Sequence, residues 1–193
     1  MLTRLLLCVA LTVAALSSAE LALAIDRVNV EYSADQIIES EAGATKSRIY
    51  STPTKERRDM SQGGSVMMVI TRHDKHVSWT VMPEEHMYME TAASQASQGQ
   101  SDLSAYQIEQ TSLGEDTING VVMNKSKIIM TSTDGTKMGG FMWTTQEGIL
   151  AKIDAIAVEQ GQKSRFKMEQ TNITIAKQPA ELFEIPNGFQ KLD

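Results

Sequence analysis

The sequence has a single cysteine in 193 residues, and this cysteine, Cys8, lies in an N-terminal segment that we expect to be removed on export. The mature chain should therefore contain no disulfide and no reactive thiol. Exported domains that are too small to bury a good core usually depend on disulfides. This chain is long enough to bury one core without them. We therefore expect a single domain over residues 25–193.

Basic clusters and long apolar runs are also missing from the mature chain. The net charge is −6, and no block of lysine and arginine is present to neutralise phosphates. This composition argues against nucleic-acid binding and against attraction to an anionic membrane surface. No stretch after the N-terminal segment approaches the roughly 20 apolar residues that a membrane-spanning helix needs. We expect a chain that does not span a membrane once the N-terminal segment is gone.

The N-terminus has the three parts of a secretory signal peptide. Residues 1–4 carry positive charge, 5–16 is apolar, and Ala22-Leu23-Ala24 matches the pattern for cleavage. We predict a signal peptide over residues 1–24 with cleavage after Ala24, Ala19 being the second choice. A buried N-terminal helix is the alternative. Cys8 lies too early in the apolar run to be a lipid-attachment site. The mature protein is expected to be periplasmic or secreted.

The mature chain is dominated by short runs in which apolar and polar residues alternate. Val77, Trp79 and Val81 alternate with Ser78 and Thr80, and side chains two apart in a strand share one face of a sheet. Similar runs recur up to Ile175 and are separated by short polar turns such as the one at 119–120. This spacing predicts an all-β, mainly antiparallel meander or barrel.

Two segments depart from this alternation. Residues 91–104 are rich in Ala, Ser, Gln and Gly, which predicts a polar linker or a short helix. Residues 179–183, which begin with Pro179, are expected to form one helical turn. Little other helix is expected besides the signal peptide.

Six short motifs occur in one order along most of the mature chain. They are Arg57-Arg58-Asp59-Met60, Ile70-Thr71-Arg72-His73-Asp74, Trp79-Thr80-Val81-Met82-Pro83, Met87-Tyr88-Met89-Glu90, the stretch 114–120, and Leu182-Phe183-Glu184-Ile185-Pro186-Asn187-Gly188-Phe189. In this order they resemble an uncharacterised bacterial periplasmic family that is known only as a domain of unknown function. That family is similar in plan to the LolA/LolB-like lipoprotein-carrier superfamily.

The resemblance implies a strongly bent antiparallel sheet, an unclosed β-barrel whose concave apolar face holds acyl chains in the carriers. The implied partners are a lipid, a lipoprotein acyl chain or another protein of the cell envelope. Members of the resembled family often carry a cysteine after the hairpin glycine, where this chain has Met123 in the corresponding region.

Methionine is the unusual component, with 12 residues, of which all but Met1 lie in the mature chain. Its flexible, polarisable side chain suits surfaces that adapt to varied apolar ligands, although ordinary core packing is the alternative. Alternation alone does not tell which sheet face is a cavity and which is core. The candidate apolar binding residues, which also include aromatic and branched residues expected to pack the sheet, are Met67, Trp79, Val81, Met87, Met89, Met130, Phe141, Met142 and Trp143.

A second hypothesis is a Cu(I) site. Thioether sulfur is a soft ligand that selects Cu(I), and His86, Met87 and Met89 lie together in the sequence. Apart from this alternative the sequence predicts no metal site and no cofactor.

The sequence contains no Gly-x-Ser-x-Gly and no His-Glu-x-x-His motif, and we expect no enzymatic activity. Glu84-Glu85 is typical of a solvated hairpin tip rather than of an acid/base pair. The pairs Gly63-Gly64 and Gly139-Gly140 are interpreted as turns or bulges. A binding protein for an apolar ligand is therefore the main hypothesis. A protein-interaction or sensor module without a small ligand is the alternative.

Overall fold

A computed structural model gives the structure of the chain over residues 28–41, 43–62, 64–93, 106–118, 120–132, 135–159 and 162–192. The predicted signal peptide and residues 94–104 of the predicted linker lie outside this part of the chain.

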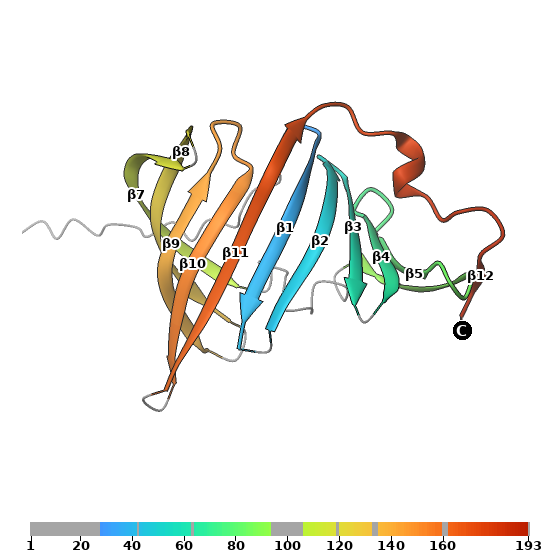
Figure 1. Ribbon diagram of the computed structural model, residues 1–193, viewed down its shortest axis with the longest axis horizontal. Coiled ribbons are helices and arrows are strands. Elements are labelled where there is room, and N and C mark those ends of the chain that lie inside the picture. Colours follow the sequence, from blue (N-terminus) through green and yellow to red (C-terminus); the bar gives the residue numbers. More distant parts are fainter. Residues whose placement is uncertain are drawn as a thin grey trace, which may run out of the picture.

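The described residues form one sheet of twelve strands and a single 3₁₀ turn, so the predicted all-β class is confirmed (Figure 1). The order across the sheet is β12-β6-β5-β4-β3-β2-β1-β11-β10-β9-β8-β7. The elements are β1 (Tyr32–Ser40), β2 (Gly43–Thr52), β3 (Lys55–Gln62), β4 (Ser65–Arg72), β5 (Val77–Met82), β6 (Met87–Ala92), β7 (Gln107–Ile118), β8 (Val121–Thr131), β9 (Lys137–Thr144), β10 (Leu150–Glu159), β11 (Gln162–Ile175), η2 (Ala180–Phe183) and β12 (Gln190–Lys191).

Two meanders of hairpins build this sheet, one from β1 to β6 and one from β7 to β11. Antiparallel pairing of β1 with β11 joins them at the centre, and only the short β12 pairs in parallel, with β6. Because the order ends at β7 on one side and β12 on the other, the barrel is unclosed. Figure 1 shows the sheet as strongly bent, with β7 at one end and β12 at the other. This is the bent, unclosed plan that the family resemblance implied.

Bulges contribute to the bending. The register shifts between Ser33 and Asp35 where β1 pairs with β11, and β11 carries Asn172 there with a φ of 51°. Further shifts occur between Ser112 and Gly114 and between Leu150 and Lys152. An extra residue in one strand bends it and increases the local twist.

The two faces of the sheet are packed differently in the two halves. We call the face that carries Gln36, Met60 and Ile153 the inner face, and the opposite face the outer face. In the β7–β11 half, the inner face holds the largest buried cluster, with Ile153 completely buried. Its buried members are Ile108, Ile128, Met130, Met142, Ile153, Ala155 and Met168.

In the β3–β6 half, it is the outer face that is covered. After β11 the chain crosses this face as the segment 176–192, which includes η2 and β12 (Figure 1). Phe183 is buried there against Ile70, Trp79 and Val81. The helical turn predicted near Pro179 is thus present as η2, and its role is to bring Phe183 onto the sheet.

One prediction about glycine is wrong. Gly139 and Gly140 form neither a turn nor a bulge, because both lie inside β9 and pair regularly with β8 and β10. A Cβ atom on Gly140 would lie 2.1 Å from the carbonyl oxygen of Asp154 and 2.5 Å from the Cα of Ala155. Gly140 is therefore required for the close approach of β9 and β10.

Candidate binding surface on the inner face

Four methionines line up across the β3–β6 half of the inner face. Met60 of β3 is paired with Met67 of β4, and Met82 of β5 is paired with Met87 of β6. The β4–β5 register pairs Met68 with Val81, and one step further along the same register Met67 lies beside Met82. We call this set, Met60, Met67, Met82 and Met87, the methionine row.

The methionine row is open to solvent. Met67 is 37% exposed, and Met60, Met82 and Met87 are half-buried. Met89, two residues after Met87 on the same face, is 45% exposed. Among the described residues, the segment that covers this half packs on the outer face only. Such a row of partly exposed methionine is unusual on a protein surface, because neighbouring large apolar side chains normally face a partner or ligand.

A shallow groove continues from the row toward the centre of the sheet. It has a volume of about 90 Å³ and is lined by side chains of β1, β2 and β3, with Met60 at one end and Ile38 at the other. The remaining lining residues are Gln36, Ser40, Gly43, Thr45, Ser47 and Arg58. The volume is well below the roughly 300–1,000 Å³ of an enclosed small-molecule site. A ligand here would lie along an open surface.

The groove connects the methionine row to the buried cluster of the other half. Ile38, which lines the groove, also packs against the cluster that contains Ile153 and Met168, and Ile38 is paired with Met168 across β1 and β11. A track with apolar side chains in both halves therefore runs over the inner face, and at β2 its lining is Gly43, Thr45 and Ser47. Nine of the methionines lie on it: Met60, Met67, Met82, Met87, Met89, Met130, Met138, Met142 and Met168.

Polar groups flank the track at its centre. Gln36 and Gln170 are opposite each other on β1 and β11, and both are buried. The Oε1 atom of Gln170 has no hydrogen-bond partner among the described residues. Arg58 lines the groove and donates a 2.7 Å hydrogen bond to Glu56. The groove therefore has one guanidinium and one buried carboxamide, that of Gln36, in its wall.

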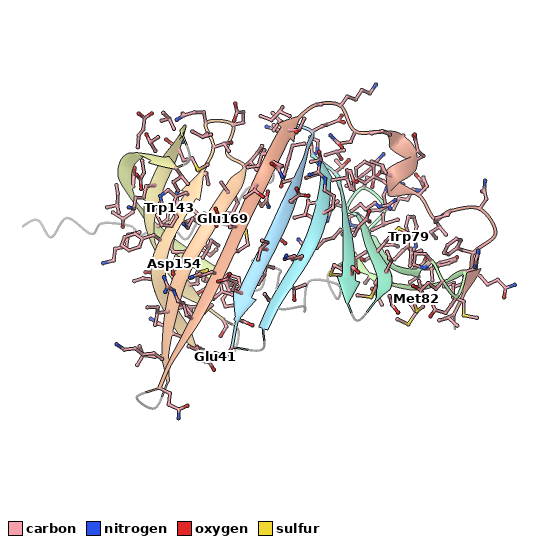
Figure 2. The ribbon with its side chains drawn as sticks, viewed as in Figure 1. Glu41, Trp79, Met82, Trp143, Asp154 and Glu169 are labelled. Carbon is pink, nitrogen blue, oxygen red and sulfur yellow. The ribbon has the colours of Figure 1, made fainter. Side chains whose placement is uncertain are left out.

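The structure divides the predicted binding residues between the two faces. On the inner face lie Met67, Met87, Met89, Met130 and Met142. On the outer face lie Trp79, Val81, Phe141 and Trp143. Figure 2 shows Trp79 on the side of β5 toward η2 and Met82 on the other side. The predicted methionines thus all lie on the inner face, in both halves of the sheet, whereas the predicted aromatic residues lie on the opposite face.

Both tryptophans are held by a carboxylate and a lysine. Trp79 Nε1 donates to Glu90 at 2.9 Å, and Lys191 lies 2.8 Å from the same carboxylate. Hydrogen bonding by Lys191 first, and by Trp79 second, lowers the pKa of Glu90. This arrangement ties β12 to β5 and β6.

The second tryptophan repeats the pattern at the other end of the sheet. Trp143 Nε1 donates to Asp116 at 3.0 Å, Lys125 lies 3.1 Å from Asp116, and the pKa of Asp116 is lowered, mainly by the Trp143 hydrogen bond. The ammonium groups of Lys125 and Lys152 lie 5.0 and 5.3 Å from the Trp143 ring. Because the Nε1–H group of each tryptophan is hydrogen-bonded within the sheet, we interpret Trp79 and Trp143 as structural residues.

A second hollow lies beside Trp143, at the end of β7, β8, β10 and β11. Its volume is about 250 Å³, and its apolar lining includes Ile118, Met123 and Ile173. Charged and polar residues, among them Lys152, Glu169 and Asn172, form the rest of its wall. This hollow was not anticipated from the sequence and is separate from the methionine row.

The three residues of the copper hypothesis do not share one face. Met87 and Met89 are on the inner face, whereas the ring of His86 lies 5.3 Å from the ring of Phe189, which belongs to the outer-face cluster. Within the described part of the chain, no three His, Cys, Asp or Glu side chains converge as metal ligands. The predicted binding residues also omitted Met60 and Met82, two members of the methionine row. The hairpin turn at 63–64 was the signal that could have identified Met60, because a two-residue turn pairs Gln62 with Ser65 and therefore Met60 with Met67.

Comparison with known families and structures identifies the domain. Residues 36–165 match a family described as a domain of unknown function, DUF4412. The chain belongs to the DUF4412 family. Together with the bent, unclosed sheet, this membership confirms the predicted resemblance to a family known as a domain of unknown function. A comparison with curated protein sequences gave no match.

Solved structures share the fold of this DUF4412 domain at low sequence identity. An uncharacterized conserved protein from Thermus thermophilus has a TM-score of 0.59 and 13% identity, covering 87% of this chain and 95% of that chain. MucB has a TM-score of 0.51 and 12% identity, covering 86% of this chain and 62% of MucB, so the chain spans less than two thirds of MucB. These likenesses establish the fold alone. In the described ranges no helix is long and apolar enough to cross a membrane.

Proposed function

We propose that this DUF4412 domain is a non-catalytic binding protein of the cell envelope that holds one acyl chain along the methionine row and the adjoining groove. The observation that carries the proposal is the alignment of Met60, Met67, Met82 and Met87 on a face that stays exposed. Methionine adapts its three rotatable bonds to irregular apolar shapes, which suits a flexible hydrocarbon chain.

The track is long enough to hold one acyl chain. It runs over six neighbouring strands, from Met87 on β6 to Ile38 on β1. Strands in a sheet are spaced about 4.8 Å apart, so five spacings give a track of roughly 24 Å. One acyl chain spans half of a hydrocarbon core of roughly 30 Å, or about 15 Å.

The polar groups beside the track support an acyl ligand with a polar head. Arg58 offers a guanidinium at the groove for a carboxylate or phosphate oxygen. Gln36, which lines the same groove, offers a side-chain amide. The predicted signal peptide supports a location outside the cytoplasm, where such a ligand would come from the cell envelope.

The test is a binding titration of the mature chain, residues 25–193, with palmitate and with the uncharged 1-monopalmitoylglycerol. The two matched variants are Met67→Glu and Val66→Glu, because these residues are neighbours on β4, are exposed to a similar degree and point to opposite faces. A carboxylate at position 67 must lose water when an acyl chain covers it. We expect Met67→Glu to weaken binding of both ligands by at least about tenfold, or 1.4 kcal/mol.

Val66→Glu should bind both ligands as tightly as the wild-type chain. Equal weakening by both variants would mean that the charge acts through fold stability or long-range repulsion, and it would contradict an inner-face site. Absence of palmitate binding to the wild-type chain would remove the acyl-chain proposal and favour the predicted protein-interaction module, for which the long exposed edge strand β7 is the available surface.

A further inference from the structure

The methionine row also has the chemistry of a soft metal site. Each of its members is opposite or beside another methionine on the next strand. Directly opposed residues on antiparallel strands have Cβ atoms about 5 Å apart, and the long methionine side chain has three rotatable bonds. Three neighbouring sulfurs can therefore converge on one ion without any movement of the backbone.

The ligand type selects the metal. Thioether sulfur is soft and uncharged, so it prefers Cu(I) over Zn²⁺, Mg²⁺ or Ca²⁺, which need thiolate, imidazole or oxygen ligands. The described residues hold no cluster of three His, Cys, Asp or Glu side chains that would attract those harder ions. The four methionines are uncharged. The two charged side chains on the inner face of β3, Arg58 and Glu56, are paired with each other at 2.7 Å, so together they add no net charge beside the row.

We propose that Met60, Met67, Met82 and Met87 form a Cu(I)-binding site, in which three thioethers at a time hold the ion. Met67 and Met82 are the central ligands, because each has a methionine on both sides in the row. This assignment differs from the copper site predicted from sequence, since His86 packs against Phe189 on the outer face and is not a ligand.

The test uses the mature chain labelled with ¹³C at the methionine methyl groups and titrated without oxygen. The probes are Cu(I) kept reduced by ascorbate, and Ag(I) as a redox-stable soft ion. One equivalent of either ion should shift the methyl signals of Met60, Met67, Met82 and Met87. The signals of Met68 and Met123, which lie on the outer face, should not move. Zn²⁺ should move none of them.

Leucine variants test whether Cu(I) binding needs the sulfur atoms of the row. Met67→Leu and Met82→Leu keep the volume and apolar area but remove the sulfur. Each should weaken Cu(I) binding by at least about tenfold, which is the lower end of what loss of a supporting group costs a metal site. Met123→Leu is the control for loss of a sulfur elsewhere.

A variant with leucine at all four positions that binds Cu(I) as tightly as the wild-type chain would overturn the metal site. So would methyl shifts that spread evenly over all methionines, or wild-type binding weaker than about 1 µM, equivalent to 8.2 kcal/mol. Any of these results would leave the acyl-chain proposal standing. Palmitate titration of the wild-type chain tests the acyl-chain proposal separately.

Discussion

Arg72 of β4 donates a 3.3 Å hydrogen bond to the backbone carbonyl oxygen of Phe183, 111 positions along the chain. The same guanidinium donates to Glu184 and, at 2.7 and 2.8 Å, to both oxygens of Asp74. Arg72 is buried, at 4% exposure. One side chain therefore fastens the C-terminal segment to the outer face, and this fastening leaves the inner face as the open surface.

Removal of that guanidinium should destabilise the fold. In Arg72→Met, the Phe183 carbonyl group and two carboxylates lose their common donor, and a buried position loses its hydrogen bonds. We expect the free energy of unfolding to fall by about 2–3 kcal/mol, measured by urea denaturation. Arg165→Met breaks a bidentate pair with Asp154 whose arginine side chain is 56% exposed, and it should cost less than about 1 kcal/mol. Equal losses would contradict the role of Arg72.

Phe183 should stabilise the fold chiefly through the burial of its apolar ring. It is 1% exposed and packs against Trp79, Val81 and Ile70. Phe183→Ala should lower the free energy of unfolding by about 3–4 kcal/mol, because it leaves a cavity under the C-terminal segment. The fluorescence of Trp79 should shift to longer wavelength as water reaches its ring. Phe141→Ala makes the same chemical change at a residue that is 41% exposed and should cost only about 1 kcal/mol.

Stability should fall in strong acid because of Asp74. The hydrogen bond from Arg72 lowers the pKa of Asp74 from 3.8 to about 2. A group whose pKa is lower in the folded state stabilises the fold above its ordinary pKa, and this contribution is lost as the pH falls through the folded-state value. The free energy of unfolding should therefore decline between about pH 4 and pH 2. Asp74→Asn should flatten this part of the stability profile, and an unchanged slope would contradict the assignment.

Alanine substitution at the two adjacent glycines of β9 should change the free energy of unfolding by very different amounts. At Gly140 the new methyl group would overlap the Asp154 carbonyl oxygen at 2.1 Å, and only a backbone shift between β9 and β10 can relieve it. We expect Gly140→Ala to cost about 3 kcal/mol. Gly139 has nothing within 4 Å of a Cβ position, so Gly139→Ala should stay within about 1 kcal/mol of the wild-type chain. Thermal unfolding of both variants checks this difference.

Local sequence patterns were enough to predict the strands and part of the methionine row. Alternation around Trp79 and a turn at 63–64 are local features, and strand pairing across a short turn follows from them. The pairing of Met82 with Met87 could have been derived in the same way, because only the turn at 83–86 separates them. The family resemblance carried the rest of the fold prediction, including the bend of the sheet.

The face on which Trp79 and Val81 lie could not be predicted. These residues have the same alternation as Met67 and Met89, and they become core only because Phe183 returns from far along the chain to cover them. Gly140 was misinterpreted for a similar reason. Glycine is needed at this position because the backbone of β10 leaves no room for a Cβ atom, and nothing in the sequence of β9 itself indicates this. Contacts between distant segments determine which face is closed, and a single alternating pattern carries no information about them.

The most direct test of the inner-face binding surface is a methionine-methyl NMR titration of the mature chain with palmitate. An acyl chain lying on the methionine row should shift the signals of Met60, Met67, Met82, Met87 and Met89, and should leave those of Met68 and Met123 unchanged. A shift of Met123 alone would move the ligand to the 250 Å³ hollow beside Trp143 and would contradict the account.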